Sequence, residues 1–333
     1  MGPDDLLLIV MLSALTVYAL LGGADFGAGV WEFITVLRAS DKERQHIYKA
    51  IGPVWEANHV WLIFVLVILM NGFPLAFAAL SRALWLPLLM ALCGIVFRGA
   101  SFAFRSYGQE SYRERKLWEA VFAIASTATP LFLGASAGAV ASGKLAITVT
   151  GFYEADYLSG WLSPLAVFSG FYMIGLCAFL AAVYLFREAD QANDMELVEL
   201  WRQRSLLTGI GMGGGALGGL ILVWLEAPSL TGGFAARGWP LIILSIGCGI
   251  GSLIEVWRFR SKRAVGAATG AVAAVIWGWG ISQYPAIIPP VITSAVAKAP
   301  DNVLWIMLAV ILTGAALLLP ALGYLFVLFK SRP

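Results

Sequence analysis

Charged and reactive side chains are scarce in this chain. Only 13% of its 333 residues are charged, and it contains two histidines and three cysteines. The cysteines lie at unrelated spacings inside apolar segments, without a CxxC or CxxCH motif. This pattern argues against a disulfide framework, covalently attached haem or an iron–sulfur cluster. We therefore interpret Cys93, Cys177 and Cys248 as packing residues.

The start of the chain lacks the basic region and the small-residue cleavage site of a signal peptide, so we expect its first apolar run to be a retained helix. Hydrophobic residues make up 60% of the sequence, and the mean hydropathy is +0.82, as is typical of a polytopic, all-α membrane protein. Nine segments are long enough to cross a hydrocarbon core of roughly 30 Å. They are 6–34, 54–77, 82–104, 117–140, 160–186, 205–226, 239–257, 264–282 and 303–329.

The polar connections between these segments are too short to fold alone, so we treat 1–333 as one transmembrane domain. Lys and Arg collect on cytoplasmic loops, and alternate connections here differ strongly in cations. One side holds only Arg82, Lys144, Arg237 and Lys298. The other receives Arg38, Lys42, Arg44, Lys49, Arg105, Arg113, Arg115, Lys116, Arg187, Arg202, Arg204, Arg258, Arg260, Lys262, Arg263, Lys330 and Arg332. The sequence thus predicts an outer N-terminus and a cytoplasmic C-terminus.

Several ionisable residues fall inside the first four apolar segments. Glu56 and His59 open the second segment, and Glu119 lies in the first turn of the fourth. At about 1.5 Å of rise per residue, Asp25 lies roughly 14 Å and Arg98 roughly 9 Å from the cytoplasmic edge. Such residues are costly in hydrocarbon and commonly mark proton or ion pathways. If the helices form one bundle, these groups can meet, either as a proton path or as a structural ion pair of Arg98 with Asp25 or Glu56.

A metal or haem site is an alternative interpretation of the same residues. Glu56-x-x-His59 and Glu43-x-x-His46 both have the i, i+3 spacing of di-iron carboxylate bundles. The second copy lies in a charged connection, however, and a complete site needs two further glutamates on facing helices. Two histidines are also too few for a subunit that holds several haems, so we expect no metal here and keep His59 only as a candidate single ligand.

Ordered motifs in the first 110 residues resemble subunit II of cytochrome bd-type ubiquinol or menaquinol oxidases. They are GADFGAG at 23–29, a basic connection at 38–49, GPVWEANHVWL at 52–62, FPLAF at 73–77, and FRG to FRS at 97–106. The remaining two thirds of the chain agree with this family mainly in the number of helices. The resemblance implies a four-helix bundle at 1–140, a second at 141–283 and a peripheral ninth helix at 284–333.

The resemblance also implies a bacterial inner-membrane complex with a haem-bearing subunit I. That subunit carries two haem b and one haem d, oxidises quinol, and reduces O2 to water with protons drawn from the cytoplasm. Subunit II itself ligates no haem, is not catalytic alone, and in some members holds a structural quinone or meets a small single-helix accessory subunit. We expect membrane lipid but no nucleic acid among its partners.

On this sequence, the acids of the family's first two helices fall on Asp25 and Glu56, and its third-helix arginine falls on Arg98. Some relatives have Asp in place of Glu56 and Gln in place of His59, so the resemblance assigns His59 no role. We predict a proton pathway through Asp25, Glu56, His59 and Arg98. The residues that we expect near haem or at the subunit interface are Trp55, Asn58 and Trp61.

Two other functions remain open at this point. A proton-coupled secondary transporter or channel would use the same buried groups, although Pro and polar residues do not recur at matching places in two halves of the chain, as inverted repeats would require. A purely structural escort would use the buried charges to fix the subunit interface. Coexpression with a haem-bearing subunit separates the transporter from the oxidase, and haem loss on mutation would indicate the escort.

Overall fold

The computed structural model describes residues 2–38, 41–51, 55–107, 112–153, 158 and 160–330. Within these ranges it leaves out the side chains of 36–38, 41, 51, 55–57, 106–107, 112, 115, 319, 322–323 and 325–330. The helices are α1 (Pro3–Arg38), α2 (Asp41–Ile51), α3 (Trp55–Gly72), α4 (Pro74–Ala83), α5 (Trp85–Tyr107), α6 (Tyr112–Ser142), α7 (Pro164–Gln191), α8 (Met195–Glu226), α9 (Pro228–Gly233), α10 (Trp239–Trp257), α11 (Ser261–Gln283), α12 (Ser294–Ala297) and α13 (Asp301–Lys330). A π-helical turn, η1 (Phe234–Gly238), and a hairpin of β1 (Ala286–Ile288) and β2 (Ile292–Thr293) complete the described chain.

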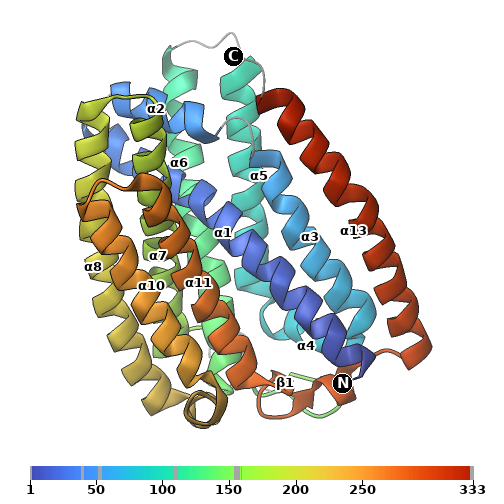
Figure 1. Cartoon of the computed structure of the whole chain (residues 1–333). Coiled ribbons are helices and arrows are strands. Elements are labelled where there is room, and N and C mark those ends of the chain that lie inside the picture. Colours follow the sequence, from blue (N-terminus) through green and yellow to red (C-terminus); the bar gives the residue numbers. More distant parts are fainter. Residues whose placement is uncertain are drawn as a thin grey trace.

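The protein is a polytopic, all-α membrane protein, as its composition predicted. Eight of the described helices are long and apolar enough to cross a membrane, and α3 with α4 makes a ninth candidate if this bent pair is one span. Each of the nine predicted segments overlaps one of these helices or, at 54–77, the bent pair. The long helices stand roughly side by side, with the chain's N-terminus at one end of the molecule (Figure 1).

The segment 54–77 is not the continuous helix that its hydropathy suggested. Helix α3 ends at Gly72, and α4 leaves it at an angle of 116°. Pro74 cannot donate a backbone hydrogen bond, and Phe73 between the helices has a non-helical backbone with φ −133° and ψ 59°. The chain therefore bends at Phe73 and begins a new helix at the proline.

Two helices differ from the sequence expectations near the membrane surface. The polar connection 35–53 contains the amphipathic helix α2, whose Ile47 is fully buried. Helix α8 begins ten residues before the predicted 205, and its first turns are rich in Glu and Arg. Those turns carry charges that pair with α2, including Arg204 with Glu43 at 2.8 Å.

Helix α1 lies between the other helices of the molecule. It packs against α3, α6 and α7, while α7 also contacts α6, α8 and α11. Helix α13 borders α1 and α3 and forms one flank of the molecule (Figure 1). Residues 22–32 of α1 are buried, apart from the partly exposed Ala24, so polar side chains in this stretch are shielded from lipid.

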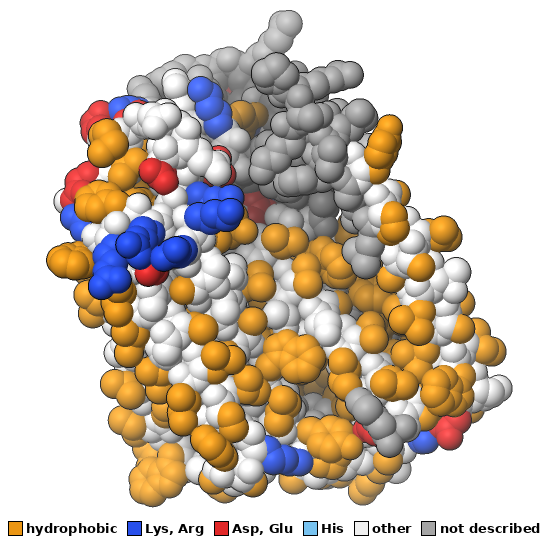
Figure 2. Space-filling view, viewed as in Figure 1, with side chains coloured by type: hydrophobic (Ala, Val, Ile, Leu, Met, Phe, Trp, Pro, Cys, Tyr) orange, Lys and Arg blue, Asp and Glu red, His pale blue; other side chains and the backbone are white. Residues whose placement is uncertain are grey.

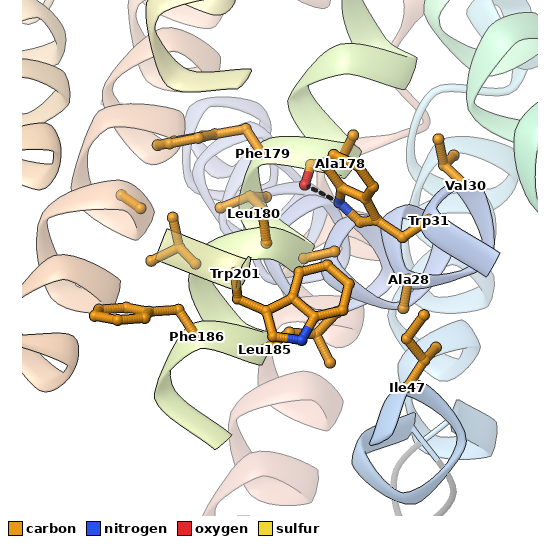
Figure 3. Packing of buried hydrophobic residues seen from close by; sticks show 14 of the residues in the cluster. Ala28, Val30, Trp31, Ile47, Ala178, Phe179, Leu180, Leu185, Phe186 and Trp201 are labelled. Carbon is orange, nitrogen blue, oxygen red and sulfur yellow. Dashed lines mark hydrogen bonds between the residues drawn. The ribbon is translucent and has the colours of Figure 1, made fainter. Parts of the chain in front are cut away.

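The largest apolar core joins α1, α2, α7 and α8 near the end of the molecule that is distant from the N-terminus. Trp31 on α1 meets Trp201 on α8 edge to face, with ring centroids 5.7 Å apart. The Trp31 indole donates a 2.8 Å hydrogen bond to the carbonyl of Ala178 on α7 (Figure 3). Ile47 brings α2 onto the same cluster (Figure 3). This core fixes the ends of α1 and α7 next to the polar residues described below.

Candidate functional site

Asp25 and Arg98 form a buried ion pair between α1 and α5. An Nη atom of Arg98 lies 2.5 Å from Oδ1 of Asp25, and the two residues are 1% and 6% exposed, respectively. The Arg98 guanidinium also donates a 3.1 Å hydrogen bond to Ser126 on α6 and lies over the rings of Phe26 and Phe122. The sequence left open whether Arg98 pairs with Asp25 or Glu56, and the structure brings it to Asp25.

The glycines around Asp25 let α1 approach its neighbours closely. A Cβ atom at Gly27 would overlap the backbone carbonyl of Cys177 on α7, and one at Gly29 would overlap the side chain of Ser126 on α6. Small residues at such contacts allow helix backbones to meet in a membrane. The acid is therefore held in a tightly packed junction of α1, α6 and α7.

Three polar atoms around Asp25 are buried without a hydrogen-bond partner among the described residues. They are Oδ2 of Asp25, Nδ1 of His59 and the hydroxyl of Tyr18. The His59 ring lies 6.2 Å from the Tyr18 ring and 5.7 Å from the Phe26 ring, measured between centroids. Unsatisfied buried polar atoms are rare and are commonly served by a water or an ion. Three such atoms thus lie close together between α1 and α3.

The other predicted residues of the α3 motif are only partly described. The backbone of Trp55 and Glu56 is helical, but their side chains lie outside the described residues. Asn58 is 5% exposed, and Trp61 packs partly buried beside the cluster of Tyr18, Phe26 and Cys177. Asp25, His59 and Arg98 thus lie in one region, and the position of the Glu56 carboxylate remains a prediction.

A second charged layer lies closer to the cation-rich end, and sequence reasoning named Glu119 in it but missed Glu32. Glu32 on α1 lies 2.8 Å from Arg105 on α5, and Glu119 on α6 lies 3.1 Å from Arg44 on α2. Glu32 lies inside the predicted apolar segment 6–34 and was not named as a candidate site residue. Its position seven residues after Asp25, on the same helical face, is the signal that could have identified it.

The two histidines occupy different parts of the molecule. A ring nitrogen of His46 on α2 lies 3.2 Å from the Leu185 carbonyl on α7, whereas His59 lies beside Asp25. Among the described residues, no three His, Cys, Asp or Glu side chains are grouped as a metal site requires.

A cavity of 540 Å³ opens at the end of the molecule that holds the N-terminus. Its lining is mostly apolar and comes from α1, α3, α4, α6, α11 and the segment before β1. Two polar atoms of its lining residues, Nε1 of Trp279 and Oε1 of Gln283, are buried without a hydrogen-bond partner among the described residues. Arg237 and Tyr284 lie at its polar rim, where Arg237 donates to the Tyr284 carbonyl at 2.6 Å.

The family of the chain follows from comparison with known proteins. The family described as cytochrome bd terminal oxidase subunit II matches residues 4–329. The chain belongs to this family. This subunit II is 28% identical over 171 residues to cytochrome bd-I ubiquinol oxidase subunit 2 of Escherichia coli (strain K12), which is 50% of this chain and 44% of that protein. It is 29% identical over 130 residues to cytochrome bd ubiquinol oxidase subunit 2 of Bacillus subtilis (strain 168), which is 39% of this chain and 38% of that protein.

A solved structure supports the same fold. A chain of the bd oxidase from Geobacillus thermodenitrificans matches this subunit II with a TM-score of 0.79 and 21% identity, over 100% of both chains. The curated alignments, in contrast, span less than half of the relatives' lengths. The family and the fold are therefore shared along the chain, whereas the activity of the complex is treated below as a proposal.

Proposed function

We propose that this chain is the haem-free subunit II of a terminal oxidase that oxidises quinol and reduces O2 to water. In this proposal Asp25, Glu56, His59 and Arg98 help carry protons from the cytoplasm toward a haem in the partner. The observation that carries the proposal is the buried Asp25–Arg98 pair, in which Oδ2 of Asp25 has no hydrogen-bond partner among the described residues, with His59 packed against the adjacent Phe26. A charged pair this deep in a membrane protein is costly, and proton relays are a common reason for it.

The geometry suggests a division of roles among these residues. Arg98 binds Oδ1 of Asp25 and balances the charge of the carboxylate. Oδ2 remains without a partner among the described residues and is the atom that would take up and release a proton. The imidazole of His59 would accept that proton directly or through water, and Glu56 lies one turn earlier on α3. Trp55 and Trp61 lie on the same helix and are proposed to face the haem or the subunit interface, whereas the burial of Asn58 within this subunit does not fit the interface predicted for it.

The partner in this proposal is a subunit I that holds two haem b and one haem d. The scarcity of histidine supports this division, because several haems need more axial ligands than His46 and His59 supply. A small single-helix accessory subunit, quinol and membrane lipid complete the proposed partners. The chain alone is not expected to be catalytic.

We also propose the orientation and the internal organisation of the subunit. Exposed cations gather at one end, as Figure 2 shows for the upper left of that view, and include Arg258, Arg260, Lys262 and Arg263. This end would face the cytoplasm of a bacterium, with the N-terminus outside. The helices of 1–140 and of 141–283 would form two four-helix bundles, with α13 peripheral.

The cavity beside the N-terminus is the proposed seat of a structural quinone. Its apolar lining suits an isoprenoid tail, while Trp279 and Gln283 offer a hydrogen-bond donor and acceptor. The cavity lies near the N-terminal end of α1, away from the cation-rich end. A quinone there would therefore stabilise helix packing and would take no part in proton uptake.

The test is Asp25→Asn in the assembled two-subunit oxidase. We expect turnover at saturating quinol to fall by roughly tenfold, or about 1.4 kcal/mol of barrier, with haem b and d bands intact. Unchanged turnover would remove the proton role, and loss of haem would favour the structural escort. Asp190→Asn is the matched control, because Asp190 accepts a hydrogen bond from Ser261 far from this cluster. Haem bands in the chain purified alone would contradict its haem-free status.

A further inference from the structure

Three helices repeat their polar residues at an interval of seven. Asp25 is followed by Glu32 on α1, and Arg98 by Arg105 on α5. On α6 the order along the chain is reversed. Glu119, which belongs with Glu32 and Arg105, precedes Ser126, which accepts a hydrogen bond from Arg98. Seven residues make about two helical turns and about 10.5 Å of rise, so each pair shares one face of its helix. The result is two stacked polar layers.

The layer nearer to α2, here called the α2-side layer, contains Glu32, Arg105, Glu119 and Arg44. Glu32 pairs with Arg105 at 2.8 Å, and Glu119 pairs with Arg44 at 3.1 Å. Glu32 is 1% exposed and Glu119 is 5% exposed. Among the described residues, each carboxylate of this layer is thus paired with one guanidinium.

Phe122 separates the two layers. Its ring lies 5.0 Å from the guanidinium carbon of Arg98 and 5.3 Å from that of Arg105. Both arginines therefore stack on one aromatic ring, one from each layer. The ring keeps the two ion pairs from merging, and a proton that passes from Glu32 to Asp25 must travel beside it through water.

Helix α2 covers the α2-side layer at the cation-rich end. Arg44 has a side chain that is 20% exposed, compared with 10% for Arg105 and 2% for Glu32. Exposure thus decreases from Arg44 toward Glu32. Arg44 is thus the most exposed of the four side chains, and its ion pair with Glu119 lies on the side of the layer nearest the surface of the described chain.

We propose that Glu32 is the proton-uptake carboxylate that supplies Asp25, with Glu119 and Arg44 as positioning residues at its solvent side. A proton from cytoplasmic water binds the Glu32 carboxylate, passes through water beside Phe122, and reaches Oδ2 of Asp25. Glu32 is left ionised and paired with Arg105. This inference rests on the proposed proton role of Asp25.

The experiment compares Glu32→Gln, Asp25→Asn and Glu43→Gln in the assembled oxidase reconstituted in vesicles. Quinol-driven turnover, haem content and proton uptake reported by a pH-sensitive dye are measured in each. We expect Glu32→Gln to lower both rates by roughly tenfold with intact haem bands, and Glu32→Asp to restore most of the loss. Glu43→Gln is the matched control, because Glu43 also pairs with a buried arginine, Arg204, but lies outside the two layers.

The outcomes separate this inference from the proposed function. Normal turnover in Glu32→Gln with slow turnover in Asp25→Asn overturns the role of Glu32 alone. Normal turnover in both overturns the proton role of the subunit. If Glu32→Gln loses haem because Arg105 is left unpaired, the double variant Glu32→Gln, Arg105→Gln removes the charge imbalance. Slow turnover in that variant supports the inference, and normal turnover overturns it.

Discussion

At the scale of single residues, Gly27 determines how closely α1 approaches α7. A Cβ at this position would overlap the carbonyl of Cys177. We expect Gly27→Ala to destabilise the subunit by about 1–3 kcal/mol, because backbone atoms cannot yield as a flexible side chain does. The thermal unfolding midpoint of the purified oxidase measures this. Gly211→Ala on α8 is the control, since a Cβ there meets nothing within 4 Å, and an equal loss in both variants would contradict the packing argument.

Single residues also show how far sequence reasoning reached. Asp25 and Arg98 were identified because isolated charges in apolar segments stand out, and the structure places them in contact. Glu32 and Tyr18 were not identified. Glu32 lies near the end of its segment, where a charged residue is ordinary, so its seven-residue spacing from Asp25 was the sequence signal of the shared face, and the structure shows that it is buried and paired with Arg105. Tyr18 has no sequence feature that distinguishes it from an interfacial tyrosine.

At the scale of elements, ion pairs connect α2 to the ends of the long helices. Lys42 contacts Asp194 and Glu196 at the start of α8, at 3.1 and 2.6 Å. The hydrogen bond from Lys42 lowers the pKa of Asp194, and the one to Glu196 raises the pKa of Lys42. The stability that Asp194 contributes to the folded subunit is present above its ordinary pKa and is lost as pH falls through its lowered pKa in the folded state. The stability that Lys42 contributes is present below its ordinary pKa and is lost as pH rises through its raised pKa in the folded state.

These ion pairs predict how α2 responds to substitution. At neutral pH, Lys42→Met should speed amide hydrogen exchange in the first turns of α2, because the contacts to α8 are lost. The effect should be small and should shrink as salt is added, since the pair is exposed to solvent. Lys49→Met changes the same helix at its exposed far end and should leave those first turns unaltered. Equal exchange in both variants would show that the Lys42 contacts add nothing to the packing of Ile47 and the ion pairs of Glu43 and Arg44.

The same scale shows why some elements were hard to predict. Hydropathy averages over a window, so it joined α3 and the start of α4 into one segment although Gly72-Phe73-Pro74 interrupts the helix. It also missed α2, whose apolar residues are few and occupy one face of a charged helix. The charged start of α8 was assigned to a connection because its ion pairs with α2 depend on tertiary contacts.

At the scale of the whole molecule, the asymmetric distribution of cations predicts the orientation in the membrane. Lys262 is exposed at the cation-rich end of α11, and Val296 is exposed in α12, near the N-terminus of α1. We expect Val296→Cys to react with a membrane-impermeant maleimide on intact spheroplasts, and Lys262→Cys to react only after lysis. Cys93 and Cys248 are first replaced by Ala because both are partly exposed. Cys177 is buried and stays in place as an internal control for unfolding. The opposite labelling pattern would reverse the proposed orientation and, with it, place the layer of Glu32 and Glu119 on the wrong side for proton uptake from the cytoplasm.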